Sequence, residues 1–265
     1  MTDAGNGWEI PPFTSSVFKP KGSKYAVLIP VLNEGERIRR QLEEMTPLSK
    51  GQDTLMVDGG STDGSLEPAF LRRCEVRTLL VETGRSGVGA QLRAGFAYAL
   101  REGYEGIVLI DGNHKDNWEA IPSFISELEK GFDHIQGSRF LKNGRAVNTP
   151  LTRLLGIKLL HAPSISLASG FRYTDTTNGF RAYSRRFLLD KRVQPFRKIF
   201  TSYELHYYLA IRAARLGFRV KEVPVTRAYP DEGPIPTKIR FLKGNLHMLK
   251  LLIQSCLGRY NPPST

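Results

Sequence analysis

The first half of this chain alternates short apolar runs with longer amphipathic stretches, and this alternation limits the folds it can adopt. Each apolar run has the length of a strand, and each amphipathic stretch has helical spacing. Such a rhythm favours βαβ units, in which helices cover both faces of a mostly parallel sheet. The predicted strands are 25–30, 54–58, 76–81, 107–111 and 134–137, and the predicted helices are 34–45, 64–73, 87–101 and 118–130.

The rhythm breaks after Arg139, yet no linker or internal repeat marks a second domain. We therefore expect one continuous α/β domain whose later half completes the sheet. Residues 1–23, rich in Pro, Gly, Ser and Thr, are predicted to be a flexible leader outside the core. The elements predicted after the break are a helical stretch 150–169, a strand-like run 179–183, a helix 202–216, a strand 220–225 and a helix 237–256.

Charge is divided unevenly between the two halves. Residues 1–135 carry 15 Lys and Arg against 20 Asp and Glu, whereas residues 136–265 carry 23 against 6. An anionic partner is expected for the basic half. Nucleic acid is not that partner, because no zinc-ligand set, aromatic RNA-binding strand or basic heptad segment is present.

Two cysteines far apart in sequence indicate neither a disulfide framework nor a zinc site. They fit a reducing, cytoplasmic location. No secretory signal precedes the domain, and no apolar run approaches the roughly 18 residues of a spanning helix. The sequence indicates no oligomeric state.

Polar residues follow three of the predicted strands. Ligands of open parallel sheets bind beyond the carboxyl ends of the strands, so these residues are expected to meet in one crevice. Helix capping and turn chemistry could explain one such cluster but explain three less well. A carboxylate such as Asp111 can hold a divalent cation that bridges to substrate phosphates, whereas Asp58 and Asp63 could accept hydrogen bonds from a base or ribose. The clusters are Asn33–Glu34, Asp58–Ser65 and Asp111–Asn113.

These motifs resemble those of family 2 glycosyltransferases, which have the Rossmann-like GT-A fold. The later segments resemble the polyprenyl-phosphate branch of that family, typified by dolichyl-phosphate mannose synthases, and the resemblance covers about residues 24–240. The motifs are PVLNE (30–34), DGGSTDGS (58–65), GRSGVGAQLRAGF (84–96), IDGN (110–113), DTTNGFRAYSRR (175–186) and the stretch 203–225.

The resemblance implies a GDP- or UDP-sugar donor, a Mg²⁺ or Mn²⁺ ion on its diphosphate, and inversion at the anomeric carbon. It divides the domain into a nucleotide-sugar half, 24–135, and a basic acceptor half, 136–240. It places Asp111 and Asn113 at the metal and names Asp111, Arg139, Asp175 and Arg181 as catalytic. The expected nucleotide-sugar pocket consists of Pro30, Asn33, Glu34, Asp58, Gly59, Asp63, Gly84 and Arg85.

One position departs from the family pattern, because Asn113 stands where the second Asp of an Asp-x-Asp motif is usual. Asp116 could supply the missing carboxylate, or Lys115 could neutralise part of the diphosphate.

In the acceptor half, Arg227 and Lys238 are expected to bind the acceptor phosphate. They flank a Pro- and Gly-rich loop, 229–236, that could close over the site.

A polyprenyl phosphate is the leading acceptor, and its phosphate oxygen needs no catalytic base. A soluble hydroxyl acceptor is the alternative, with Asp175 or Glu204 as the base, although Asp175 could equally cap a turn. A nucleotide-binding regulatory module without turnover is a third hypothesis.

Residues 241–265 are predicted to form an amphipathic helix and tail, which either lies peripherally on the inner face of a membrane or packs on the core.

Overall fold

The computed structural model describes residues 7–48, 51–84, 87–230 and 241–263. The strands are β1 (Phe13–Val17), β2 (Tyr25–Val31), β3 (Asp53–Asp58), β4 (Val76–Glu82), β5 (Gly106–Leu109), β6 (His134–Ser138), β7 (Arg145–Val147), β8 (Arg181–Ser184), β9 (Val220–Pro224) and β10 (Thr226–Ala228). The α-helices are α1 (Glu36–Met45), α2 (Pro68–Arg73), α3 (Val88–Arg101), α4 (Ile121–Glu129), α5 (Leu151–Gly156), α6 (Ala162–Ser169), α7 (Arg185–Leu189), α8 (Glu204–Arg215) and α9 (Phe241–Cys256). A π-helical turn, Ile157–His161, joins α5 to α6, and short 3₁₀ turns occupy Thr46–Leu48 and Trp118–Ala120.

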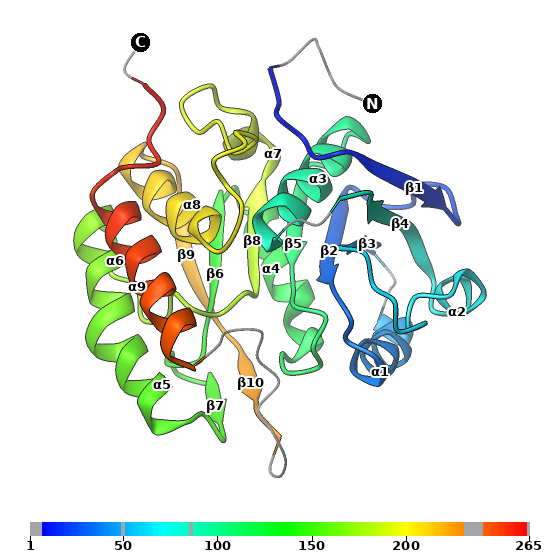
Figure 1. The fold of residues 1–265 in the computed structure, drawn as a ribbon, viewed down its shortest axis with the longest axis horizontal. Helices are drawn as coiled ribbons and strands as arrows, with labels where there is room; N and C mark the ends of the chain where they lie inside the picture. Colours follow the sequence, from blue (N-terminus) through cyan, green and yellow to red (C-terminus); the bar gives the residue numbers. More distant parts are fainter. Residues whose placement is uncertain (1–6, 49–50, 85–86, 231–240, 264–265) are drawn as a thin grey trace.

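Eight strands form one sheet in the order β1-β4-β3-β2-β5-β8-β6-β9, which runs through the middle of the molecule (Figure 1). The pairs β4-β3, β3-β2, β2-β5 and β6-β9 are parallel, and β1 and β8 run antiparallel to their neighbours. The predicted mostly parallel α/β sheet is confirmed. A separate two-stranded parallel sheet pairs β7 with β10.

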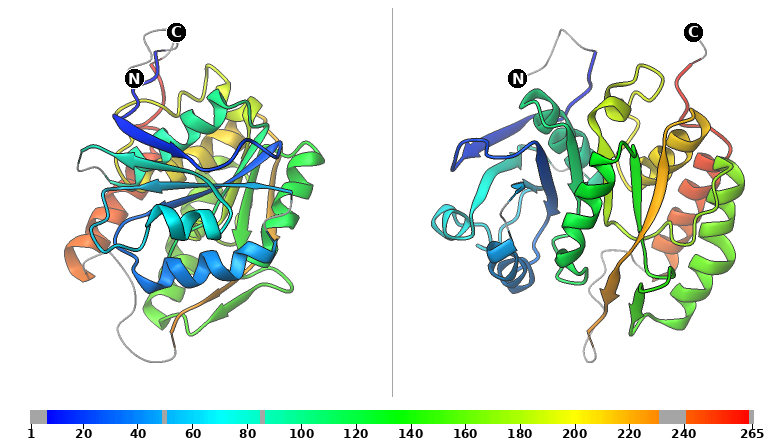
Figure 2. Two further views of the ribbon diagram at one scale, coloured as in Figure 1. Left: turned by 90° about the vertical axis from the view of Figure 1, so that its right-hand side faces the viewer. Right: turned by 180° about the vertical axis from the view of Figure 1, so that it is seen from behind.

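Helices cover both faces of the large sheet (Figure 2), and an apolar layer lies on each face. Residues of α1, α2 and α4 bury one face, and residues of α3, α7 and α8 bury the other. The inner strands are apolar on both faces because both are covered, as parallel strands require. Gly95 lets α3 approach the sheet closely, since a Cβ there would lie 2.6 Å from the Leu28 side chain.

Residues 7–23 are part of the domain, which corrects the prediction of a flexible leader for this part of residues 1–23. β1 adds an antiparallel edge strand to β4, from Phe13 opposite Glu82 to Val17 opposite Thr78. Trp8 stacks on Phe196 with ring centroids 4.1 Å apart. The polar composition misled the prediction because an edge strand has one open side and needs few apolar residues.

Two predicted boundaries shift for physical reasons. The predicted helix 64–73 begins only at Pro68, because the preceding residues form a hydrogen-bonded loop. The run 179–183 becomes β8 at Arg181–Ser184, inserted antiparallel between β5 and β6.

The terminal helix packs on the core through Leu251 and Leu252, next to α6 and α8. Within the described ranges, no helix combines the length and the apolar character needed to cross a bilayer.

Candidate active site

The polar strand ends converge as expected, because β3, β2 and β5 are adjacent parallel strands that end at one edge of the sheet. The Gln91 side chain of α3 holds two of these ends together. Its Nε2 donates to the carbonyl oxygens of Val31 and Val57 at 2.8 and 2.9 Å. Gly59 N also donates to Val31 O at 2.9 Å, so the carboxyl ends of β2 and β3 are held together.

Asp58 and Asn33 connect the two loops on the donor side. Asp58 Oδ1 accepts hydrogen bonds from Ser61 N at 2.8 Å and Ser61 Oγ at 2.6 Å. Asn33 N donates to Ser61 Oγ at 2.9 Å, and Asn33 Oδ1 accepts from Thr62 N at 2.8 Å. The loops after β2 and β3 therefore form one unit. All the hydrogen bonds described for Asp58 go to one of its two carboxylate oxygens.

Asp63 lies in the loop that follows β3, and its carboxylate accepts hydrogen bonds from the donor-side loops. Its Oδ1 accepts from Ser65 N and Oγ at 3.1 and 2.7 Å, and its Oδ2 accepts from Gly35 N at 2.7 Å. Both carboxylate oxygens of Asp63 accept hydrogen bonds from backbone N–H groups. The geometry therefore favours a role in positioning the loop rather than in contacting a ligand. Glu34 lies in the same loop and pairs with Arg37 at 2.9 Å.

The remaining predicted pocket residues lie at the same edge or outside the described part of the chain. Pro30 is in β2, opposite Val57 of β3. Gly84 is exposed just beyond β4. Arg85 and Lys238 fall outside the described residues, as does most of the predicted lid loop 229–236.

Asp111 sits at the centre of an ionic cluster just after β5. Its Oδ2 accepts from Arg227 Nη2 at 2.9 Å and from Asn113 Nδ2 at 3.3 Å. The other terminal nitrogen of Arg227 donates to Asp116 Oδ2. Arg227 is buried, whereas 32% of the Asp111 side chain stays accessible, so this carboxylate is open to a ligand.

The cluster mixes charges of both signs in a confined space. Burial alone would raise the pKa of Asp111, but Arg227 and Lys115 hold it below its usual range. Burial raises the pKa of Asp116 despite its pairing with Arg227. Burial and the nearby Arg227 lower the pKa of Lys115. Asp111 is thus the carboxylate that stays ionised most readily.

Two further residues fix the position of Asp111. The buried Gln41 side chain of α1 donates from Nε2 to Asp111 O at 3.0 Å and accepts from His114 N at 2.8 Å. On the other side, a Cβ at Gly179 would lie 2.5 Å from Asp111 Oδ1. Sequence reasoning missed both contacts, because they join positions about 70 residues apart.

α8 brings Tyr203 and His206 toward the same cluster, and the sequence analysis assigned neither a role. Burial and the nearby Asp111 raise the pKa of Tyr203. Burial and Arg181 lower the pKa of His206 to about 3, so its imidazole is neutral at pH 7. His206 Nδ1 is buried and has no hydrogen-bond partner within the described ranges. Their spacing in an ordinary amphipathic helix gave no signal that these side chains face the site.

Arg139 and Asp175 bind each other. Arg139 Nε and Nη2 donate to Asp175 Oδ2 and Oδ1 at 2.6 and 3.0 Å, and Arg139 Nη2 also donates to Thr177 Oγ1 at 2.8 Å. Both side chains are inaccessible to solvent. The predicted catalytic roles, a cation for Arg139 and a base for Asp175, do not fit this geometry. Each group neutralises the other away from the crevice.

Arg181 also differs from the prediction of an anion-binding catalytic residue. Its guanidinium donates to the carbonyl oxygens of Thr176, Asn178 and His206 at 2.8, 3.0 and 2.8 Å. The side chain is fully buried. It therefore ties the 176–178 loop, which adjoins Gly179, to the start of α8.

The donor atoms near Asp111 are suited to a divalent cation. Asn113 Oδ1 is buried and lacks a hydrogen-bond partner in the described structure, and a carbonyl oxygen is a ligand that Mg²⁺ accepts. No cluster of three or more His, Cys, Asp or Glu is present in the described ranges. A cation held by Asp111 and Asn113 would take its remaining ligands from water and phosphate oxygens, as Mg²⁺ commonly does.

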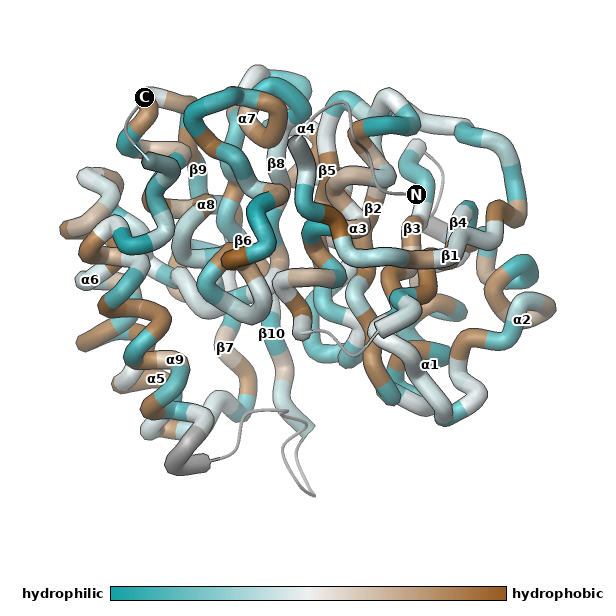
Figure 3. The backbone as a smooth tube through the Cα atoms, turned by 45° about the horizontal axis from the view of Figure 1, so that its top comes forward, coloured by the Kyte–Doolittle hydropathy of each residue, from teal (hydrophilic) through white to brown (hydrophobic). Residues whose placement is uncertain are grey.

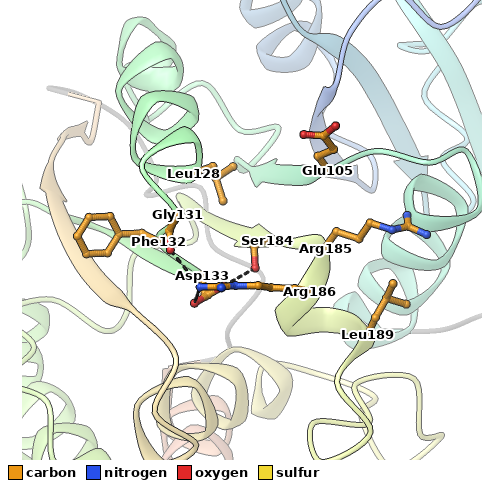
Figure 4. Close-up of a pocket in the computed structure, with 9 residues that line it drawn as sticks. All are labelled: Glu105, Leu128, Gly131, Phe132, Asp133, Ser184, Arg185, Arg186 and Leu189. Atoms are coloured by element: carbon orange, nitrogen blue, oxygen red, sulfur yellow. Dashed lines mark hydrogen bonds and ion pairs between the residues drawn. The ribbon is translucent and has the colours of Figure 1, made fainter.

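A separate cavity of about 500 Å³ lies at the opposite, amino-terminal edge of the sheet (Figure 4). Its buried Asp133 accepts hydrogen bonds from Ser184, Arg186 and the backbone of Arg219. Both oxygens of this carboxylate accept hydrogen bonds, so Asp133 is a structural anchor of the cavity. The candidate active site is the Asp111 edge.

Solved structures identify the fold class. Glucosyl-3-phosphoglycerate synthase from Mycobacterium tuberculosis in complex with UDP aligns with a TM-score of 0.60 at 19% identity, covering 92% of this chain and 82% of that one. Its complex with Mn²⁺ and UDP-glucose aligns with a TM-score of 0.59. This fold, with polar loops at the carboxyl edge of the sheet, is that of the GT-A glycosyltransferases.

The sequence match is more specific. The model of the family described as "Glycosyl transferase family 2" matches residues 26–191, and the chain belongs to this family. The undecaprenyl-phosphate mannosyltransferase of Micrococcus luteus is 30% identical over 201 residues, which are 75% of this chain and 81% of that protein. The polyprenol monophosphomannose synthase of Mycolicibacterium smegmatis is 30% identical over 203 residues, 76% of each chain. The protein is therefore a glycosyltransferase, and the predicted family is confirmed.

Proposed function

We propose that this enzyme transfers a sugar from a nucleotide-sugar to a polyprenyl phosphate, with inversion at the anomeric carbon. The relatives named above act on undecaprenyl phosphate and polyprenol phosphate, which supports this acceptor. The observation that carries the proposal is the burial of Asp175 and Glu204, the two residues that the sequence offered as the base for a hydroxyl acceptor.

Asp175 is paired with Arg139 through both carboxylate oxygens and is inaccessible. Glu204 is buried and accepts from Ser202 N at 2.7 Å, as well as from Thr201 N, at the start of α8. A sugar or metabolite hydroxyl needs a base in hydrogen-bond reach, whereas a phosphate oxygen is already a nucleophile at neutral pH. The geometry therefore favours a phosphate acceptor over a hydroxyl.

The nucleotide-sugar would bind in the crevice between β2 and β3, with its base near Asp58 and its diphosphate near Asp111. In the reaction, the acceptor phosphate oxygen forms a bond to the anomeric carbon as the bond from that carbon to the diphosphate breaks. The electron pair goes to the departing diphosphate. Lys115 and Arg227 lie where this negative charge develops and stabilise it electrostatically.

Asp111 and Asn113 would hold a Mg²⁺ or Mn²⁺ ion, which supplies positive charge to the diphosphate when bound. Gln41 and Gly179 keep the Asp111 carboxylate in place for this task. Arg181 and the Arg139–Asp175 pair act as positioning residues, because they brace the 175–179 loop against Asp111.

The test is an incubation of purified protein with a panel of UDP- and GDP-sugars, Mg²⁺ or Mn²⁺, and a polyprenyl phosphate. The two layers after phase separation are then analysed by mass spectrometry. Sugar in the organic layer supports the proposal and identifies the donor. Transfer only to water-soluble hydroxyl acceptors would contradict it.

A further inference from the structure

Several leucines project into solvent along the helical segment that runs from α5 through the π-helical turn to α6. Residues 151, 155 and 159 are four apart and so share one helix face. A row of exposed leucines costs free energy in water unless something covers it. The leucines, with their exposed fractions, are Leu151 (68%), Leu155 (47%), Leu159 (73%), Leu160 (41%) and Leu167 (84%).

α9 adds a second row beside the first. Leu246, Ile253 and Leu257 are 69%, 49% and 71% exposed, whereas Leu251 and Leu252 on its other side are buried. α6 and α9 are in contact, and Cys256 Sγ donates to Ser164 O at 3.6 Å. Figures 1 and 2 show the two segments side by side at the end of the molecule far from β1. In Figure 3, apolar positions recur along both segments. These eight exposed side chains are called the leucine face below.

The charged residues on the segments that carry the leucine face have one sign. The sequence contains no Asp or Glu between Asp133 and Asp175, and none after Glu232. Lys158, Lys250 and Arg259 are exposed on the same helices or just after them. Exposed apolar residues flanked by cations only are typical of helices that lie in the surface of an anionic bilayer. A second copy of this chain is a poorer partner, because it would bring like charges together.

The leucine face is connected directly to the active site. Arg153 Nη1 of α5 donates to the hydroxyl of Tyr229 at 2.5 Å. Lys115 Nζ lies 5.3 Å from the centre of the Tyr229 ring, and Lys115 O accepts from Ala228 N at 2.8 Å. The neighbouring Arg227 binds Asp111. The side chains of Tyr229 and Lys115 therefore connect the start of α5 to the cluster around Asp111.

We propose that the leucine face docks the enzyme on an anionic phospholipid bilayer, with its leucines in the headgroup region. Docked in this way, the enzyme presents the Asp111 edge to a phosphate carried by a lipid of that membrane. The benefit for catalysis rests on the proposed acceptor. The docking itself does not, because it depends only on exposed apolar area and positive charge.

The test compares wild type with a triple variant, Leu155→Ser, Leu159→Ser and Leu167→Ser, in sedimentation with vesicles. Wild type is expected to bind vesicles of phosphatidylcholine with one third phosphatidylglycerol. The triple variant is expected to bind them at least about tenfold more weakly, because three apolar side chains no longer leave water on docking. Salt should weaken the binding of wild type, because the positive charges contribute. The matched control is Val17→Ser, which removes a 53% exposed apolar side chain from β1 and should leave binding unchanged.

Activity separates docking from chemistry. The triple variant should transfer sugar to a short, water-soluble prenyl phosphate at the wild-type rate, and to a long-chain polyprenyl phosphate in vesicles at least about fivefold more slowly. Equal vesicle binding by wild type and triple variant would overturn the docking proposal. So would a lipid-free dimer that the three substitutions dissociate. If neither acceptor is used, the proposed function fails, while the sedimentation result still decides the docking.

Discussion

The donor-side loops and the Asp111 cluster both contain carboxylates at the same edge of the sheet, but they hold them differently. Asp58 and Asp63 accept hydrogen bonds from backbone N–H groups and serine hydroxyls. Asp111 and Asp116 share the guanidinium of Arg227. The neutral donors on the first side fix the shape of the loops, whereas the ionic partner on the second balances charge next to the proposed reaction. Substitutions on the two sides should therefore damage different steps.

The largest expected effect comes from Asp111→Asn. This change removes the charge that would help hold the cation and leaves Arg227 with Asp116 alone, so kcat should fall by about 10³-fold or more. Steady-state kinetics with the donor and acceptor that the transfer assay identifies provide the measurement. The matched change on the donor side, Asp63→Asn, should loosen the loop and raise the donor KM by about three- to tenfold with kcat near wild type. Equal loss of kcat in both variants would remove the distinction between the two sides.

Next in size is the buried Arg139–Asp175 pair. Asp175→Asn leaves Arg139 buried without its partner charge, which should lower the free energy of unfolding by about 3–5 kcal/mol in urea titrations. Asp190→Asn is the control, because its partner Arg192 is exposed, and it should cost less than about 1 kcal/mol. An Asp175→Asn protein of wild-type stability that is inactive would instead indicate a catalytic base.

A smaller effect is expected from Gly179→Ala. The added Cβ would lie 2.5 Å from Asp111 Oδ1, and Asp111 cannot move freely because Arg227 and Asn113 hold it. A displacement of this kind should lower kcat by about 30- to 100-fold. Gly156→Ala is the control, since nothing lies within 4 Å of a Cβ there. Wild-type turnover in Gly179→Ala would show that the position of Asp111 is not critical.

The smallest expected effect concerns Glu82, at the end of β4 on the donor side. Burial raises its pKa to about 7, with Arg93 opposing the shift and Asp58 adding to it. Because the pKa of the folded state lies above that of the unfolded chain, the stability that protonated Glu82 contributes is full below about pH 4.5 and is lost as the pH rises through 7. Glu82→Gln should then be more stable than wild type at pH 8 by about 1–2 kcal/mol, after allowance for solvent screening. Thermal unfolding at pH 5 and pH 8 tests this, and a difference that does not change with pH would contradict it.

Sequence reasoning performed differently in the two regions for the same reason that they differ in structure. The loops assigned to the donor follow apolar runs directly, and β2 and β3 end at residues 31 and 58, within one residue of the predicted strand ends. The residues that hold Asp111 come from positions 41, 179 and 227, and their meeting depends on β8 inserting antiparallel beside β5. The hydrophobic periodicity of the sequence does not predict where β8 inserts in the sheet. Arg139, Asp175 and Arg181 were predicted in catalytic roles for a related reason, because a motif identifies residues without showing whether they bind each other or a ligand.

The base-free transfer to a lipid phosphate is tested most directly by a pair of acceptors that differ in one group. The enzyme is given the same nucleotide-sugar with a polyprenyl phosphate or with the corresponding polyprenol, in vesicles of the same composition. The geometry around Asp175 and Glu204 predicts lipid-linked sugar with the phosphate and none with the alcohol. Transfer to the polyprenol at a comparable rate would show that a base is available and would contradict the proposed mechanism.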